Sequence, residues 1–332
     1  MMKMKKVFLI MLLGITSLAK AQVDPHFSQY YMHPLWLNPA LTGAINGDYR
    51  IALIDRNQWS GVTNAFSTQG LMGDITTNKN INVGLSLLQE SAGDAGYKYF
   101  NGLASVSYSG IRLGKEGLKV ISFGMSAGLV NRRFDFSKAY FGSQYTPYFG
   151  FDPTKTSGEH FGTRATTTLD LSAGVAYYDG DPDKKVNFFG GFSAAHLNQA
   201  KDVFVDTSIN NGKVPMRFTL HGGARILLSD RASVVPNALI MKEAGATEMM
   251  LGGYLQIAAT DDFDVMGGLN YRVGDAVYPY IGVNFNSFII GLSYDINASQ
   301  LGAGAKASSY EFSLMYSNKK ATDKGYFKCP RF

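Results

Sequence analysis

The sequence predicts an all-β fold: a transmembrane antiparallel β-barrel of about 14 strands, with short periplasmic turns and longer extracellular loops. Three observations lead to this prediction: an export signal at the N-terminus, strand-length segments in which apolar residues alternate with small or polar ones, and connections whose lengths sort by parity. Charged residues make up 17% of the chain and aromatic residues 13%, whereas about a quarter of a typical soluble chain is charged. An ordinary β-rich secreted protein has a similar composition, so the prediction depends on the three patterns.

Residues 1–21 are predicted to be a cleaved signal peptide. A basic start is followed by an apolar run and by a small-x-small cleavage site, namely Lys3 to Lys6, Val7 to Gly14 and Ala19-Lys20-Ala21. The apolar run is shorter than the roughly 20 residues of a membrane-spanning helix. Cleavage would remove four lysines and no acid from 31 basic and 26 acidic residues, which leaves a net charge of +1. We therefore expect no nucleic acid among the partners, because the basic excess belongs to the export signal.

The segment 288–297 shows the alternation most clearly. Every second residue in it is apolar, and the residues between are mostly small or polar; the apolar set is Phe288, Ile290, Leu292, Tyr294 and Ile296. Successive side chains of a strand point to opposite faces. In a membrane barrel the apolar face meets lipid and the other face lines the lumen. In a soluble sandwich the apolar face would be the core, and alternation alone does not separate the two folds.

Strand lengths and connections favour the barrel. We expect strands at 49–57, 65–73, 80–88, 97–110, 118–132, 167–178, 185–197, 214–227, 231–242, 247–259, 262–272, 276–285, 287–297 and 307–317. Many match the roughly 9–11 residues that cross a bilayer on a tilt. Connections after even-numbered strands are short, whereas the long ones, above all 133–166 and 198–213, follow odd-numbered strands. This sorting is typical of outer-membrane barrels and predicts that the odd-numbered connections face outward.

Two motifs that suggest chemistry have simpler explanations. Gly124-Met125-Ser126-Ala127-Gly128 matches the G-x-S-x-G nucleophile elbow, which requires a strand, a strained turn and a helix. Here the motif lies inside a predicted strand, where Ser126 faces the lumen with other small residues. Asp179, Asp181 and Asp183 resemble the start of a calcium loop but lack its later Gly and Glu, and they suit a turn. The five histidines have no metal-ligand spacing, so we expect no catalytic residue, no cofactor and no metal.

The segment 22–47 is the most distinctive part of the chain. Its prolines disfavour a regular β-ladder, and its aromatic and aliphatic residues argue against a disordered leader. It is therefore predicted to be a lumen plug, a periplasmic docking strip, or both. The complete domain prediction is a signal peptide at 1–21, this segment at 22–47, the barrel at 48–317 and a periplasmic tail at 318–332. The single cysteine, Cys329, has no partner for an internal disulfide.

Three short motifs resemble those of the PorP/SprF family. They are Asp24-Pro25-His26-Phe27-Ser28-Gln29-Tyr30, then Asn38-Pro39-Ala40-Leu41-Thr42-Gly43, and the ending Cys329-Pro330-Arg331-Phe332. The resemblance implies an outer-membrane barrel of the type IX secretion system of Bacteroidota. Members of that family belong to the core machinery or accompany particular large surface proteins, including gliding adhesins. The resemblance suggests partner binding by Asp24, Pro25, Phe27, Ser28, Gln29, Tyr30, Asn38, Pro39, Ala40, Cys329, Pro330 and Phe332.

The expected function is a non-enzymatic outer-membrane component that helps secrete surface proteins such as adhesins or anchor them. Its expected partners are outer-membrane lipid, other type IX secretion components and a secreted client. Two other classes stay open. A passive pore or transporter for small solutes would need a wide, charged lumen, whereas many inward positions are Gly, Ser and Ala. A hydrolase would need a nucleophile, a base and an acid close together, and no spacing indicates them.

Overall fold

The computed structural model describes residues 24–59, 65–77, 79–93, 95–114, 117–135, 138–146, 148, 150–158, 165–204, 210–297 and 308–319. The predicted signal peptide and the motif that contains Cys329, Pro330 and Phe332 lie outside these residues. Within them, no helix is long and apolar enough to cross a membrane.

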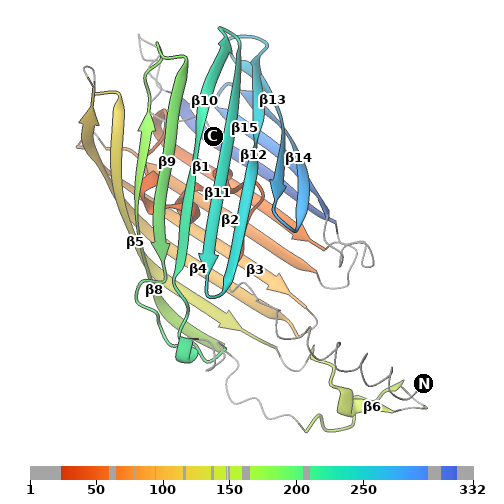
Figure 1. The fold of residues 1–332 in the computed structure, drawn as a ribbon. Helices are drawn as coiled ribbons and strands as arrows, with labels where there is room; N and C mark the ends of the chain where they lie inside the picture. Colours follow the sequence, from red (N-terminus) through yellow and green to blue (C-terminus); the bar gives the residue numbers. More distant parts are fainter. Residues whose placement is uncertain are drawn as a thin grey trace, which may run out of the picture.

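Fourteen strands form one closed antiparallel barrel, which confirms the predicted fold class (Figure 1). They are β1 (Gly47–Gln58), β2 (Phe66–Ile75), β3 (Ile81–Ala92), β4 (Tyr97–Leu113), β5 (Lys119–Arg133), β8 (Ala165–Asp179), β9 (Val186–Ala195), β10 (Arg217–Ser229), β11 (Ala232–Glu243), β12 (Ala246–Ala258), β13 (Phe263–Arg272), β14 (Ala276–Phe285), β15 (Phe288–Asn297) and β16 (Ser309–Lys319). Each predicted strand overlaps one of them. Strand β1 pairs with β16, and this pairing closes the ring.

The ends of the barrel differ in the length of their connections. The rim that we call the long-loop rim carries connections 59–65, 93–96, 134–164, 196–216, 244–245, 273–275 and 298–308. The opposite rim, the short-turn rim, carries 76–80, 114–118, 180–185, 230–231, 259–262 and 286–287. Connection 134–164 also contains a small hairpin that was not predicted, formed by β6 (Tyr145–Thr146) and β7 (Gly150–Phe151). That hairpin lies at the long-loop rim, at the lower end of Figure 1.

The alternation in the sequence corresponds to the two faces of the wall. On β15, the side chain of Leu292 is 47% exposed on the outer face, whereas that of Ser293 is 5% exposed and faces the lumen. The same period of two runs along β13 and β4. Closing the ring pairs the strand edges with each other, so the backbone hydrogen bonds are satisfied within the wall, as a bilayer requires.

The segment 24–46 lies inside the ring of strands, where it appears in red and orange in Figure 1. It contains a 3-10 helix η2 (Tyr30–Met32), a one-turn α-helix α2 (Pro34–Leu37) and a second 3-10 helix η3 (Pro39–Leu41). Asn38 is extended, with φ −160° and ψ 118°, since the residue before a proline avoids the helical region. We call residues 24–46 the plug.

The depth of the outer apolar face can be tested by placing arginine at two outward positions. Leu292 is the middle one of five outward apolar residues on β15, whereas Thr247 lies on the outer face of β12 next to the long-loop rim. Arginine costs roughly 2–4 kcal/mol at the bilayer midplane and about 0–1 kcal/mol near an interface. We expect Leu292→Arg to lower the free energy of unfolding in phospholipid vesicles, measured in urea, much more than Thr247→Arg. Equal losses would contradict the assigned depths.

Candidate functional site

The candidate functional site is the contact between the plug and the lumen wall. Every plug residue is buried except for His26, Gly43 and Asn46, which are half-buried. Apolar plug residues such as Phe27 and Leu35 form one hydrophobic cluster with inward wall residues such as Tyr254 and Met250. Four groups of polar contacts then hold the plug at defined places, and they include the predicted motif residues Asp24, Ser28, Gln29 and Asn38.

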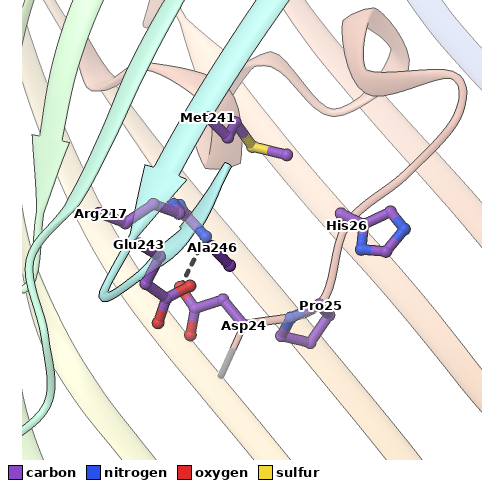
Figure 2. Close-up of a pocket in the computed structure, with 7 residues that line it drawn as sticks. All are labelled: Asp24, Pro25, His26, Arg217, Met241, Glu243 and Ala246. Atoms are coloured by element: carbon purple, nitrogen blue, oxygen red, sulfur yellow. Dashed lines mark hydrogen bonds and ion pairs between the residues drawn. The ribbon is translucent and has the colours of Figure 1, made fainter. Parts of the chain in front are cut away.

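The first group holds the start of the plug near the long-loop rim. The Oδ2 atom of Asp24 accepts a hydrogen bond from Arg217 Nη1 (2.6 Å) and lies 2.7 Å from His196 Nε2. His196 Nδ1 lies 2.9 Å from the carboxylate of Asp170. The Arg217 guanidinium also lies over the ring of Trp36, 4.2 Å from its centroid. Figure 2 shows Asp24 and Arg217 beside the wall carboxylate of Glu243.

The charges of Asp24 and His196 stabilise each other. Burial alone would lower the pKa of His196, but the carboxylates of Asp24 and Asp170 outweigh burial and raise this pKa to about 10. Burial likewise opposes ionisation of Asp24, and the nearby His196 and Arg217 nevertheless hold the pKa of its carboxyl below the usual range. At neutral pH the Asp24 carboxylate at the start of the plug is therefore ionised and paired with two cations, His196 and Arg217.

A metal ion is a poor alternative explanation of this group. Asp24, His196 and Glu243 offer ligand atoms within 4.8 Å of one another. However, the Arg217 guanidinium already contacts the Asp24 carboxylate, and a fixed cation at that distance disfavours a second one. We interpret the group as a structural ion-pair network.

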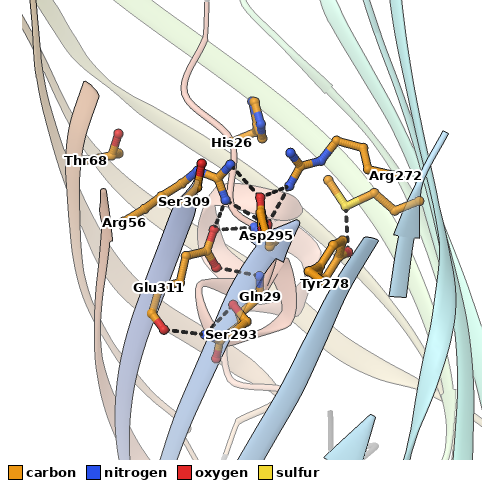
Figure 3. Close-up of polar contacts among 12 residues, drawn as sticks. His26, Gln29, Arg56, Thr68, Arg272, Tyr278, Ser293, Asp295, Ser309 and Glu311 are labelled. Atoms are coloured by element: carbon orange, nitrogen blue, oxygen red, sulfur yellow. Dashed lines mark hydrogen bonds and ion pairs between the residues drawn. The ribbon is translucent and has the colours of Figure 1, made fainter. Parts of the chain in front are cut away.

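The second group holds Ser28 and Gln29 against the strands that close the barrel. Figure 3 shows Gln29 beside Glu311 and Ser293. The carboxylate of Glu311 accepts both backbone N–H groups, from Ser28 at 2.6 Å and from Gln29 at 2.8 Å. Arg56 forms ion pairs with Glu311 and, at 3.0 Å, with Asp295. Because these side chains come from β1, β15 and β16, the plug is tied to the wall on both sides of the β1–β16 pairing.

The side chains of Ser28 and Gln29 complete this network. Ser28 Oγ donates to Asp295 Oδ1 (2.9 Å) and accepts from the guanidinium groups of Arg56 and Arg272. Gln29 Nε2 donates to Ser293 Oγ (3.1 Å), and Gln29 Oε1 accepts from Ser313 Oγ (2.7 Å). An amide has donors on one side and acceptors on the other, which explains why glutamine fits here.

The third group surrounds Asn38. Its Nδ2 donates to the carbonyl of Val175 (3.0 Å), and its Oδ1 accepts from the N–H of Ala40 (2.9 Å), which caps η3. The wall approaches so closely that a Cβ added at Gly174 would lie 2.1 Å from Asn38 Oδ1. A Cβ at Gly124 would lie 2.3 Å from the backbone between Pro39 and Ala40.

The end of the plug is fixed near the short-turn rim. Gly43 has a left-handed φ of 71°, a conformation that glycine adopts without strain. Its N–H donates to Asp74 Oδ2 (2.7 Å), and Asp74 is paired with Arg50 at 2.7 Å. Thr42 Oγ1 donates to Ser105 Oγ (2.8 Å). These contacts lead the chain out of the lumen and into β1.

The motif residues therefore meet the wall of their own barrel. Asp24, Ser28, Gln29, Tyr30 and Asn38 bring strands from every side of the ring into contact with the plug, and Pro25, Phe27, Pro39 and Ala40 pack beside them. Tyr30 donates from its hydroxyl to Asn237 Oδ1 (2.8 Å). Partner binding by these residues stays a prediction. Because they are buried, they would affect a partner through the shape of the plug.

The G-x-S-x-G match has a packing explanation. Ser126 faces the lumen and is 6% exposed, as expected from its place in the strand. Gly124 leaves room for the plug, and a Cβ at Gly128 would lie 1.9 Å from the carbonyl oxygen of Gly102 on the neighbouring strand. The glycines thus allow close approach inside a regular strand.

Sequence reasoning missed the charged residues of the lumen. It emphasised the Gly, Ser and Ala on the inward faces, but the structure also places buried charges there, including Arg50, Arg56, Asp74, Arg132, Asp170, Arg217, Asp264, Arg272, Asp295 and Glu311. Each stands at an inward position of an alternating strand, so its parity could have identified it. Most of the partners could not have been identified, since they lie on other strands, on the plug or, as for Asp202, on a rim connection.

Comparisons with known proteins found one family model and several solved structures. Residues 19–316 match the family model described as "Type IX secretion system membrane protein PorP/SprF". Among solved structures, the toluene transporter TodX of P. putida is 10% identical with a TM-score of 0.48, covering 86% of this chain and 93% of that one. The toluene transporter TbuX of Ralstonia pickettii is 8% identical with a TM-score of 0.47, covering 85% and 92%. The chain matches none of the curated protein sequences compared with it.

The fit of the plug can be tested at Gly124. A methyl group there would collide with the backbone of η3, and such overpacking typically costs about 1–3 kcal/mol. We expect Gly124→Ala to loosen the plug while the barrel still assembles. The emission of Trp36 in a Trp59→Phe background would report this as a red shift. Gly267→Ala is the matched control, because a Cβ at Gly267 meets nothing within 4 Å. An unchanged emission in Gly124→Ala would show that the plug does not lie against β5.

The ion pair at the start of the plug predicts a pH dependence. The pKa of His196 is raised from 6.5 to about 10. The stabilisation that its protonated ring gives to the folded plug is therefore complete below pH 6.5 and is lost as the pH rises through about 10. We expect Trp36 emission to stay constant from pH 6 to about 9 and to shift to the red above about pH 10. In His196→Gln this transition should be absent. A transition of equal midpoint and size in that variant would assign it to another group.

Proposed function

The chain belongs to the PorP/SprF family of type IX secretion system membrane proteins, and on that premise we propose that it acts as a plugged docking barrel. In this proposal it helps secrete surface proteins, or hold them at the cell surface, and conducts no solute. The family is non-enzymatic and its barrel lies in the outer membrane. The observation that supports the proposal is the plug, whose residues are largely buried inside the ring of strands and are hydrogen-bonded to several of those strands.

The energetics of the plug support a closed lumen. Arg56, Asp295 and Glu311 are all buried, and their ion pairs are shared with the plug. Breaking a buried pair by removing one partner costs about 3–5 kcal/mol, because the remaining charge stays in the interior. A passive pore would have to open a path past several such groups. The charged lumen, which alone would suit a pore, here serves to hold the plug.

A closed barrel acts through its rims. The long-loop rim, which we expect to face outward, carries the extended connections, and the aromatic side chains of Tyr140, Tyr145 and Tyr148 are exposed there. Aromatic residues are enriched in protein–protein interfaces. In the proposal a secreted client or adhesin docks on this rim, and other components of the secretion system contact the barrel elsewhere. The buried family motifs keep the plug, and with it the inner edge of the rims, in one conformation.

Replacing the first part of the plug tests this function. Asp24 to Tyr31 would be exchanged for a Gly/Ser segment of equal length, which keeps the export signal and the chain length. We expect the barrel to insert, as judged by heat-modifiable migration, and secretion or surface display of the client to be lost. An equal-length replacement of the exposed segment 153–156 is the control for insertion. Normal secretion with the plug replaced would overturn the proposal, and failed insertion would make the plug part of the assembling fold.

A further inference from the structure

The aromatic belt on the outer face is interrupted on one side of the barrel. Near the long-loop rim the outer faces of strands β10 and β13 to β16 end in aromatic or aliphatic residues, such as Tyr271 on β13, Tyr294 on β15 and Phe218 on β10. On β1, β2 and β3 the corresponding outward positions are polar. This group, which we call the polar wall patch, consists of Asp55, Asn57, Ser67, Gln69 and Gln89.

The strand register shows that the patch replaces belt residues. One row of paired residues crosses five strands in the order Phe312, Asp55, Gln69, Gln89 and Phe100. The two phenylalanines at its ends are exposed on the outer face, at 38% and 43%. The five-residue patch is therefore flanked by two lipid-facing aromatic rings, and beyond Phe100 the same row continues into the outward polar residues Asn131 on β5 and Thr167 on β8.

The patch lies within the apolar band. On β1 only Tyr49, Ile51 and Leu53 face outward before Asp55, so the outward apolar run spans residues 49–53. A strand needs roughly 9–11 residues to cross a bilayer. Beyond the patch, toward the rim, Trp59 packs edge-on against Phe66 with ring centroids 5.4 Å apart. Such aromatic pairs are typical of the membrane interface. The patch therefore lies between this interface and the middle of the membrane.

Asp55 is the chemical centre of the patch. Its Oδ1 accepts from Gln69 Nε2 (2.8 Å) and its Oδ2 from Asn57 Nδ2 (2.9 Å). Gln69 Nε2 also donates to Ser67 Oγ (2.7 Å). Two neutral amides fix the carboxylate, and within the described residues no ion pair neutralises it. A carboxylate on a lipid-facing wall indicates a functional contact and a partner of opposite charge. Lipid tails offer no such partner, and headgroup phosphates repel it.

We propose that the polar wall patch is the lateral docking surface for a second integral outer-membrane protein. That protein presents a lysine or arginine to Asp55, and amide or hydroxyl groups to Asn57, Gln69 and Gln89. Lipid-facing aromatic rings on both sides of the patch exclude water, which strengthens the ion pair. The proposal rests on the proposed function in one respect: the partner would be a component of the same secretion system.

Site-specific cross-linking tests the proposal in native membranes. A photoreactive amino acid at position 69 should cross-link one integral outer-membrane protein, whereas the same group at position 247, on the outer face of β12, should not. Asp55→Lys should reduce the cross-link by about tenfold or more, and Asp55→Glu should preserve it. Heat-modifiable migration verifies that each variant is a folded barrel.

A charge swap identifies the contact. The cross-linked peptide locates the partner's basic residue, and changing that residue to Asp should restore the cross-link to Asp55→Lys. Cross-links to lipid alone or to a second copy of this chain would overturn the proposal, as would full cross-linking in Asp55→Lys. These outcomes are independent of the plug-replacement experiment, because they measure proximity in the membrane and not secretion.

Discussion

Burying a polar peptide inside a barrel requires a partner for each of its hydrogen-bonding groups, and this requirement organises the whole lumen. An amide or carboxylate without a partner in the interior costs several kcal/mol, and the plug brings many of them. The wall meets much of this requirement with inward charges and hydroxyls at places where the plug exposes its backbone, whereas the buried ring nitrogens of His33 have no hydrogen-bond partner among the described residues. Glu311 illustrates the solution, since one carboxylate accepts two successive plug N–H groups and also pairs with Arg56. The spacing of the motif residues follows from where such wall groups lie.

The same constraint connects the plug to the closure of the barrel. Arg56, Asp295 and Glu311 belong to β1, β15 and β16, the strands at the two ends of the chain. Their shared contacts with Ser28 stabilise the β1–β16 pairing and the position of the plug together. The glycines of β5 and β8 complete the fit on the opposite wall, where the backbone of η3 and the side chain of Asn38 come into direct contact with the strands. Plug and barrel thus form one folded unit, in which loosening either end of the plug leaves buried charges without partners.

Local sequence patterns were sufficient to predict the strands of the wall. They could not predict which residues far apart in the sequence contact each other. The period of two identified the strands, including the facing of Leu292 and Ser293, because each residue's orientation depends only on its neighbours in the strand. The extended conformation of Asn38 was equally local, since Pro39 imposes it. In contrast, Ser28 and its partner Glu311 are separated by 283 positions. Nothing in either segment alone indicates that they meet, so the sequence left the plug and the periplasmic strip as alternatives and missed the charged lumen.

In our proposal, membership in a secretion family and a lumen closed by the plug together describe a barrel that works by contact with other proteins. The measurement that tests this most directly is the current through single purified barrels in planar lipid bilayers, first with the wild-type chain and then with the Gln29→Ala, Gly124→Ala double variant. We predict no steady conductance for the wild type, because the plug is held by buried ion pairs. We predict stepwise conductance for the variant, whose plug has lost the hydrogen bonds of the Gln29 side chain and is overpacked where η3 meets β5. A steady ohmic current through the wild-type barrel would contradict the closed lumen and return the protein to the class of passive pores.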